Sequence, residues 1–70
     1  MDIRQFWKRV KDEIKGRRLS RKSFAESVNI PYNTFKSWIY YERSVEVGTA
    51  YDIAKALGVS VEYLITGDRP

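Results

Sequence analysis

The sequence predicts an all-α fold, a compact bundle of about five helices within a single domain. Apolar residues recur at spacings of three and four residues in five stretches, as they do along the buried face of a helix. Residues that commonly flank helices stand at the borders of these stretches: the N-cap candidates are Asp2, Ser20 and Ser60, and the glycine stops are Gly16, Gly58 and Gly67. A chain of 70 residues is too short for a second domain, so the helices are expected to share one small core.

The composition excludes several classes of function. The chain contains no cysteine and no histidine, which removes disulfides, cysteine-based zinc fingers, thiol nucleophiles and histidine acid–base chemistry. Its four glycines stand apart and its carboxylates are scattered, so we expect no enzymatic activity, no cofactor and no metal. No apolar run approaches the ~18 residues of a membrane span, and the N-terminus lacks the apolar region of a signal peptide. No membrane association is therefore expected.

The positive charge is concentrated at one end of the chain. The net charge is +4, and nine of the thirteen basic residues lie within residues 1–22, together with three acidic ones. Residues 23–70 hold four basic and six acidic residues. Such a one-ended excess suits a polyanionic partner. The charge alone is explained equally well by a solvated basic surface without a specific partner.

Residues 2–15 form the first expected helix. Its apolar stripe consists of Ile3, Phe6, Trp7, Val10 and Ile14. Asp2 is the expected N-cap, and Gly16 is expected to end the helix. The opposite face is mostly Arg and Lys, so the helix could lie on an anionic membrane. We favour packing of the stripe on the other four helices, because they need it as one wall of the core.

Residues 21–40 are expected to form two short helices joined by a tight turn. The residues expected to face inward are Phe24, Ala25, Val28, Ile30, Phe35 and Trp38. Ser20 is a suitable N-cap for the first helix. Asn29 stands where the turn needs a positive φ, which Asn tolerates better than most residues. Pro31, which lacks an N–H, suits the start of the second helix.

The second of these helices has a polar outward face without an acidic residue. At 100° per residue, Tyr32, Asn33, Lys36, Ser37 and Tyr40 span about 140°, opposite the apolar side. Thr34 lies at the edge of this arc, and Ile39 lies at the border between its core and outward sides. Two helices and a tight turn of this kind are the layout of a helix-turn-helix, whose second helix enters the DNA major groove. An exposed polar face without a partner is the alternative.

Several cations and tyrosines flank this outward face and are candidate phosphate ligands. Arg21 and Lys22 occupy the first turn of a helix, where cations oppose the helix dipole unless phosphates lie nearby. The candidates also include Arg17 and Arg18 in the preceding loop, and Tyr40, Tyr41 and Arg43 in a loop expected over residues 40–44. The two tyrosines could instead belong to a dimer contact.

The last third of the chain predicts two further helices. Residues 47–57 form the fourth, with an expected apolar stripe of Val47, Ala50, Tyr51, Ala54 and Leu57. Gly58 is expected to end it. Ser60 caps a short fifth helix that Gly67 ends, and residues 68–70 are expected to begin a linker or tail.

Two blocks of the sequence carry a resemblance to a known family. They are LSRKSFAESVNIPYNTFKSW and AYDIAKALGVSVEYLITGD, in this order and nearly without gaps. With these blocks, residues 17–67 resemble the lambda-repressor-like helix-turn-helix superfamily, most closely the N-terminal domains of bacteriophage CI-type repressors. The chain departs from that family at Asn29, which replaces a turn glycine, at Pro31, which replaces a Ser or Thr cap, and at residues 39–41, which replace a Glu-x-Gly.

The resemblance implies a helix-turn-helix DNA-binding domain over residues 1–67, acting as a transcriptional repressor. Such domains bind a pseudo-palindromic double-stranded operator, usually as a homodimer, and the implied location is the cytoplasm and nucleoid of a bacterial or phage-infected cell. The base-contacting positions implied here are Tyr32, Asn33, Thr34, Lys36 and Ser37. The implied phosphate contacts include Arg21 and the loop near Tyr40, Tyr41 and Arg43.

A different class of function stays open beside DNA binding. Ile39, Tyr40 and Tyr41, with Tyr51 nearby, could form an apolar cluster that grips a protein. The chain would then be an antitoxin-like or assembly module that keeps the helix-turn-helix shape. A basic RNA-binding domain is less favoured, because the sequence contains no aromatic RNA-stacking motif.

Overall fold

The computed structural model describes residues 2–68, which form five α-helices and no strand. The helices are α1 (Ile3–Gly16), α2 (Arg21–Ser27), α3 (Tyr32–Tyr41), α4 (Val47–Leu57) and α5 (Val61–Thr66). The all-α class with five helices that the sequence predicts is therefore confirmed. Of the tail expected at residues 68–70, residues 69–70 lie outside the described residues.

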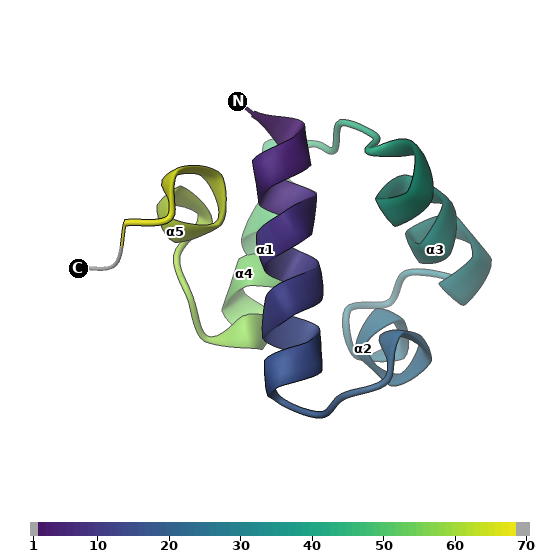
Figure 1. Cartoon of the computed structure of the whole chain (residues 1–70). Coiled ribbons are helices and arrows are strands. Elements are labelled where there is room, and N and C mark those ends of the chain that lie inside the picture. Colours follow the sequence, from purple (N-terminus) through teal and green to yellow (C-terminus); the bar gives the residue numbers. More distant parts are fainter. Residues whose placement is uncertain (1, 69–70) are drawn as a thin grey trace.

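Helix α1 lies at the centre of the molecule. Helices α2 and α3 lie on one side of it, α5 lies on the other, and α4 passes behind it (Figure 1). The described residues extend over 30 × 23 × 19 Å along the three principal axes of the molecule. Helix α1 packs against α5 on one side, and on the other its Trp7 ring contacts Phe35 of α3, which in turn packs against α2, so the long first helix joins the two sides of the molecule.

Side-chain caps fix the starts of three helices. The Asp2 carboxylate accepts hydrogen bonds from the first turn of α1 at 3.2 and 3.4 Å. The hydroxyls of Ser20 and Ser60 each accept a hydrogen bond of 2.9 Å from the backbone N–H three residues later. Each bond satisfies a backbone donor that has no partner within the helix, which confirms the three predicted caps.

Replacing Ser60 by alanine is expected to destabilise the domain by about 1 kcal/mol, since the Tyr63 N–H then loses its side-chain acceptor. For a domain of this size, that loss lowers the melting temperature by roughly 4–8 °C, measurable by circular dichroism. Ser44, an exposed loop residue, provides the control, and Ser44→Ala should leave the melting temperature unchanged. Equal shifts in the two variants would count against a capping role.

Left-handed backbone conformations at Glu42, Gly58 and Gly67 end helices α3, α4 and α5, and another forms the turn after α2. Asn29 has φ +58°, as the sequence predicts for the turn after α2. Two helix boundaries differ from the expected ones. Helix α1 continues through Gly16, and Arg18 takes the positive φ of +57°. Helix α3 continues through Tyr41, so the loop expected to begin at residue 40 begins at Glu42, whose φ of +53° ends the helix.

The core is centred on Trp7, which is 1% exposed. Its ring lies edge-on to Phe6 and Phe35, with centroid distances of 5.0 and 5.9 Å. Its indole Nε1 donates a hydrogen bond of 2.7 Å to the backbone carbonyl of Arg43, after the end of α3. The ring of Trp38, which is half-buried, lies 6.4 Å away. Thus one α1 residue fixes both the face and the end of α3.

One expectation about the core is wrong. In α4, Val47 and Tyr51 are 83% and 57% exposed, whereas Ile53 is completely buried. The buried residues of α4 are Ala50, Ile53, Ala54 and Leu57, which also follow helical spacing. Compared with the expected stripe, the helix is rotated about its axis so that Ile53 faces the core in place of Tyr51. In α3, Ile39, which the sequence places at the border between the core and outward sides, belongs to the core at 6% exposure.

Helix α5 is attached to α1 through Arg9. The Arg9 Nη1 donates hydrogen bonds to the backbone carbonyls of Leu64 and Ile65, at 3.2 and 2.9 Å. These carbonyls belong to the last turn of α5, where backbone acceptors lack partners within the helix. Gly67 then ends α5 with φ +82°. The guanidinium thus satisfies the C-terminus of a six-residue helix that is too short to be stable alone.

Candidate nucleic-acid interface

Helix α3 is held in place through one side and left uncovered along the other. Phe35 and Ile39 are buried, and Trp38 is half-buried against the core. The N–H of Ile30 donates to the carbonyl of Ala25 at 2.9 Å, which ties the turn back to α2. The aromatic rings of Phe24 and Phe35 lie 5.6 Å apart. These contacts fix α2, the turn and α3 relative to one another.

The five predicted base-contacting residues all lie on α3, but they are not equally accessible. Tyr32, Asn33 and Lys36 are exposed, whereas Thr34 and Ser37 are half-buried. Lys36 Nζ lies 5.9 Å from the ring centroid of Tyr32, one turn earlier. No acidic residue occurs between residues 32 and 41. The uncovered part of α3 is therefore polar, cationic and centred on Tyr32, Asn33 and Lys36.

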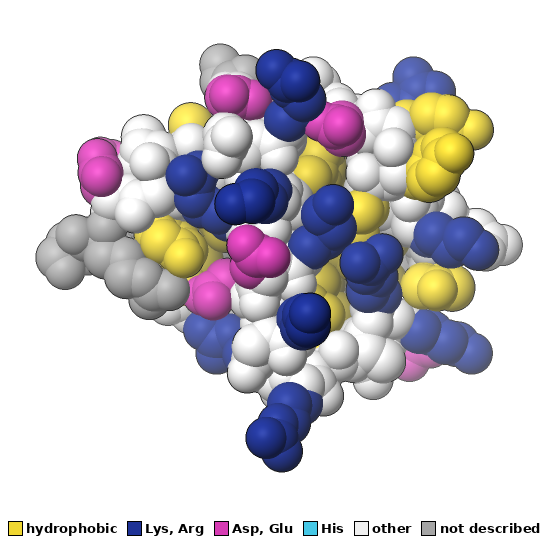
Figure 2. Space-filling model, viewed as in Figure 1, with side chains coloured by type: hydrophobic (Ala, Val, Ile, Leu, Met, Phe, Trp, Pro, Cys, Tyr) yellow, Lys and Arg dark blue, Asp and Glu magenta, His cyan; other side chains and the backbone are white. Residues whose placement is uncertain are grey.

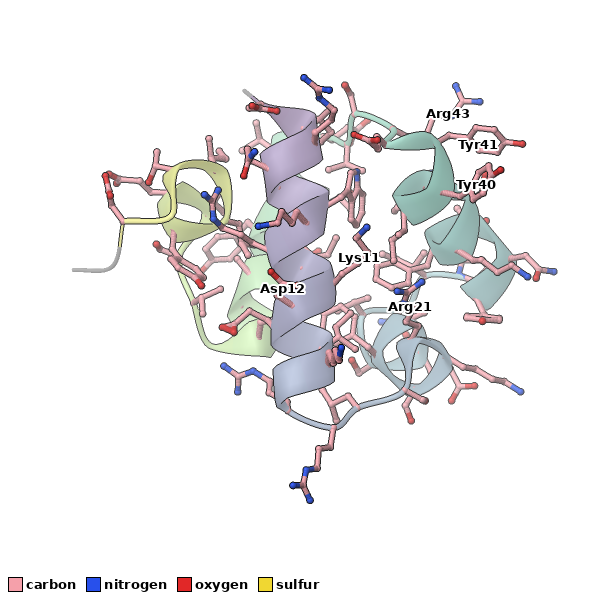
Figure 3. The ribbon with its side chains drawn as sticks, viewed as in Figure 1. Lys11, Asp12, Arg21, Tyr40, Tyr41 and Arg43 are labelled. Atoms are coloured by element: carbon pink, nitrogen blue, oxygen red, sulfur yellow. The ribbon has the colours of Figure 1, made fainter. Side chains whose placement is uncertain are left out.

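A second group of predicted site residues lies at the C-terminal end of α3. The rings of Tyr40 and Tyr41 are 78% and 62% exposed and meet edge-to-face at 4.9 Å. The guanidinium carbon of Arg43 lies 5.5 Å from the Tyr41 ring centroid. Figure 3 shows the three side chains together at this end of the helix. They bring two hydroxyls and one cation to the same point on the surface.

The cations predicted as phosphate ligands before α3 differ in whether a carboxylate lies close to them. Arg21 and Lys22, at the start of α2, are exposed. Arg17 lies 3.8 Å from the carboxylate of Glu13 on α1, so it is partly neutralised. Arg18 is exposed in the loop after α1. On the face drawn in Figure 2, Lys and Arg side chains extend from α1 across to α2 and α3, with apolar surface between them.

Lys11 is a cation of this surface that the sequence reasoning missed. A depression of about 450 Å³ lies between α1, α2 and α3. Its lining consists of Lys11, Arg21, Tyr32, Lys36, Ile39, Tyr40 and Glu42. Lys11 is placed there because it stands four residues after Trp7 and three before Ile14, at the border of the apolar stripe of α1. That spacing was the available signal.

The chain matches no model of a known family, no curated protein and no solved structure. Within residues 2–68, no helix has both the length and the apolar character needed to cross a bilayer. The same range contains no group of three or more His, Cys, Asp or Glu side chains that could hold a metal ion.

Proposed function

We propose that the chain is a sequence-specific double-stranded DNA-binding domain that acts as a transcriptional regulator. In this proposal α2 and α3 are the two helices of a helix-turn-helix, and α3 enters the major groove. The observation that carries the proposal is the two-sided character of α3. Phe35 and Ile39 anchor one side in the core, while Tyr32, Asn33 and Lys36 stand exposed on a face without carboxylates.

The exposed residues have the chemistry of base readers. The side-chain amide of Asn33 matches the N6 donor and N7 acceptor of adenine, and Lys36 can donate to guanine O6 or N7. Tyr32 can donate to a phosphate or pack against a thymine methyl group. Thr34 and Ser37 are half-buried and have short side chains, so they would contact bases only where α3 lies deep in the groove.

Exposed residues beside α3 would hold the DNA backbone. These are Arg21 and Lys22 at the start of α2, and Tyr40, Tyr41 and Arg43 at the C-terminal end of α3. Each phosphate neutralised contributes about −0.9 to the slope of log K against log salt. A helix-turn-helix regulator of the CI-repressor type would bind as a homodimer to pseudo-palindromic half-sites about 34 Å apart. It would work in the cytoplasm, at the nucleoid.

Asn33→Ala is expected to lower the preference for a selected DNA site over random DNA by about 5- to 150-fold, which corresponds to 1–3 kcal/mol. The site is first selected from a random DNA pool with the wild-type chain. Affinities for the selected site and for random DNA are then measured for each variant.

Arg21→Ala serves as the matched comparison and should weaken binding to both DNAs alike, because a phosphate contact carries no sequence information. Melting temperatures show whether each variant is folded. Equal losses on both DNAs for Asn33→Ala would contradict base reading at that position, and the absence of any enriched sequence would contradict specific recognition altogether.

A protein-binding module is the second candidate, favoured by the exposure of Tyr40 and Tyr41. Their rings form one aromatic surface at the end of α3. The burial of Ile39 removes the aliphatic member of the cluster that the sequence suggests, which reduces the apolar area on offer. No retention of duplex DNA at low salt would favour this second candidate over the first.

A further inference from the structure

We infer that Lys11 of α1 joins Arg21 of α2 and Lys36 of α3 in a clamp for one backbone phosphate of duplex DNA. The inference rests on the proposed DNA binding and adds α1 to the elements that contact the DNA. It also makes Lys36 a phosphate ligand, so that base reading falls mainly on Asn33 and Tyr32. The clamp lies in the depression between α1, α2 and α3, which we call the basic depression.

The charge of the basic depression favours an anion. Three helices contribute one cation each, and Glu42 is the one acidic residue in the lining. Among residues 2–68, no carboxylate lies within salt-bridge distance of Lys11, Arg21 or Lys36. Three cations that share a depression with a single carboxylate leave an excess of positive charge, and a phosphate between them reduces the repulsion.

Partial burial gives Lys11 a defined position. The residue is half-buried beside the apolar stripe of α1, where its aliphatic stem can lie on apolar surface while its ammonium group reaches solvent. Figure 3 shows Lys11 and Arg21 directed into the same space beside α3, one from α1 and one from the start of α2. A lysine with fewer accessible rotamers loses less entropy when it binds a ligand.

The shape of the basic depression suits the backbone of a polymer. Its volume of about 450 Å³ is open to solvent, and the side chains of Tyr32 and Tyr40 line it alongside the cations. It shares Lys11 and Arg21 with an adjoining hollow of about 430 Å³, whose lining adds one further cation, Lys15, and one carboxylate, Asp12. The two hollows together hold four cations and two carboxylates, and they form a predominantly basic path beside α1 along which a nucleic-acid strand can continue.

Lys11→Gln is expected to reduce the magnitude of the slope of log K against log salt by about 0.9, which lowers the affinity roughly eightfold at 0.1 M salt. The preference for the selected site over random DNA should not change. Lys36→Gln should behave in the same way, and Glu42→Gln should tighten binding to both DNAs. Melting temperatures are measured for every variant.

Lys8→Gln is the matched control, because Lys8 is exposed on the same helix and does not line the basic depression. Equal slopes for Lys8→Gln and Lys11→Gln would overturn the clamp while leaving the proposed function intact. If the wild-type chain fails to bind duplex DNA at low salt, the proposed function fails and the clamp fails with it.

A titration with inorganic phosphate distinguishes a DNA phosphate from a free one. The clamp predicts that inorganic phosphate binds only weakly and competes with DNA no better than sulfate does. If Lys11→Gln abolishes tight binding of inorganic phosphate and leaves the DNA slope unchanged, the basic depression is a site for a free anion. That outcome would overturn the DNA clamp.

Discussion

Trp7→Ala is expected to lose about 3–5 kcal/mol of the free energy of unfolding, the range for deleting a large aromatic side chain from a core. Trp7 is 1% exposed and packs edge-on against Phe6 and Phe35. Its loss would leave a cavity where α1 meets α3 and would leave the Arg43 carbonyl without its 2.7 Å donor. A domain of this size has a total stability of roughly 4–10 kcal/mol, so the variant should lose about half of it and unfold at a much lower urea concentration than the wild-type chain.

Two further variants separate the causes of that loss. Trp7→Phe keeps an aromatic ring but removes the indole N–H, and should lose about 1–3 kcal/mol. Tyr40→Ala also removes an aromatic ring, but from a side chain that is 78% exposed, and should change the stability by less than about 0.5 kcal/mol. Urea denaturation followed by circular dichroism measures all three. If Trp7→Ala is as mild as Tyr40→Ala, the central position of Trp7 is wrong.

Gly67→Ala is expected to destabilise the domain by about 2–4 kcal/mol. Gly67 has φ +82°, a conformation that costs an L-residue about 1 kcal/mol or more. An added Cβ would also lie 2.7 Å from Arg9 Nη2, so the guanidinium would have to move. Its two hydrogen bonds to the last turn of α5, which are worth about 1.5–3 kcal/mol when the donor is charged, would be weakened.

Gly48→Ala provides the matched control within the same chain. An added Cβ at Gly48 meets no atom within 4 Å, and the residue lies within α4 without a positive φ. Alanine should therefore stabilise that helix by up to about 1 kcal/mol. Opposite signs for the two variants in thermal denaturation are the expected result. Equal effects would contradict the role of Arg9 and Gly67 at the end of α5.

The parts of the fold that the sequence predicted depend on neighbouring residues. A capping serine such as Ser20 or Ser60 accepts a hydrogen bond from a backbone N–H three residues away. Asn29 adopts its positive φ in the short turn between α2 and α3. Apolar spacing likewise marks the existence of each helix. These signals act over a few residues, so they can be read without knowing how the helices pack.

The features that were missed depend on residues far apart in the chain. Arg9 reaches the end of α5 across more than fifty residues of sequence, and Trp7 reaches the Arg43 carbonyl. In α4, two rotations of the helix both bury a regular apolar stripe, and only packing decides in favour of Ile53 over Tyr51.

The candidate site was predicted with the same limits. The helical period assigned Asn33 and Lys36 correctly to an exposed face, but it could not reveal that neighbouring side chains partly cover Thr34 and Ser37. Nor could it reveal that Lys11 reaches the same surface from α1, since that depends on how α1 lies against α3. DNA binding by these residues stays a prediction.

The contact between Trp7 and Trp38 allows intrinsic tryptophan fluorescence to report on one place in the molecule. These are the two tryptophans of the chain, and their rings lie 6.4 Å apart where α1 meets α3. Ultraviolet emission excited at the indole band therefore comes from this junction alone. A red shift or a change in quenching would register displacement of α3 from its support, without any attached dye.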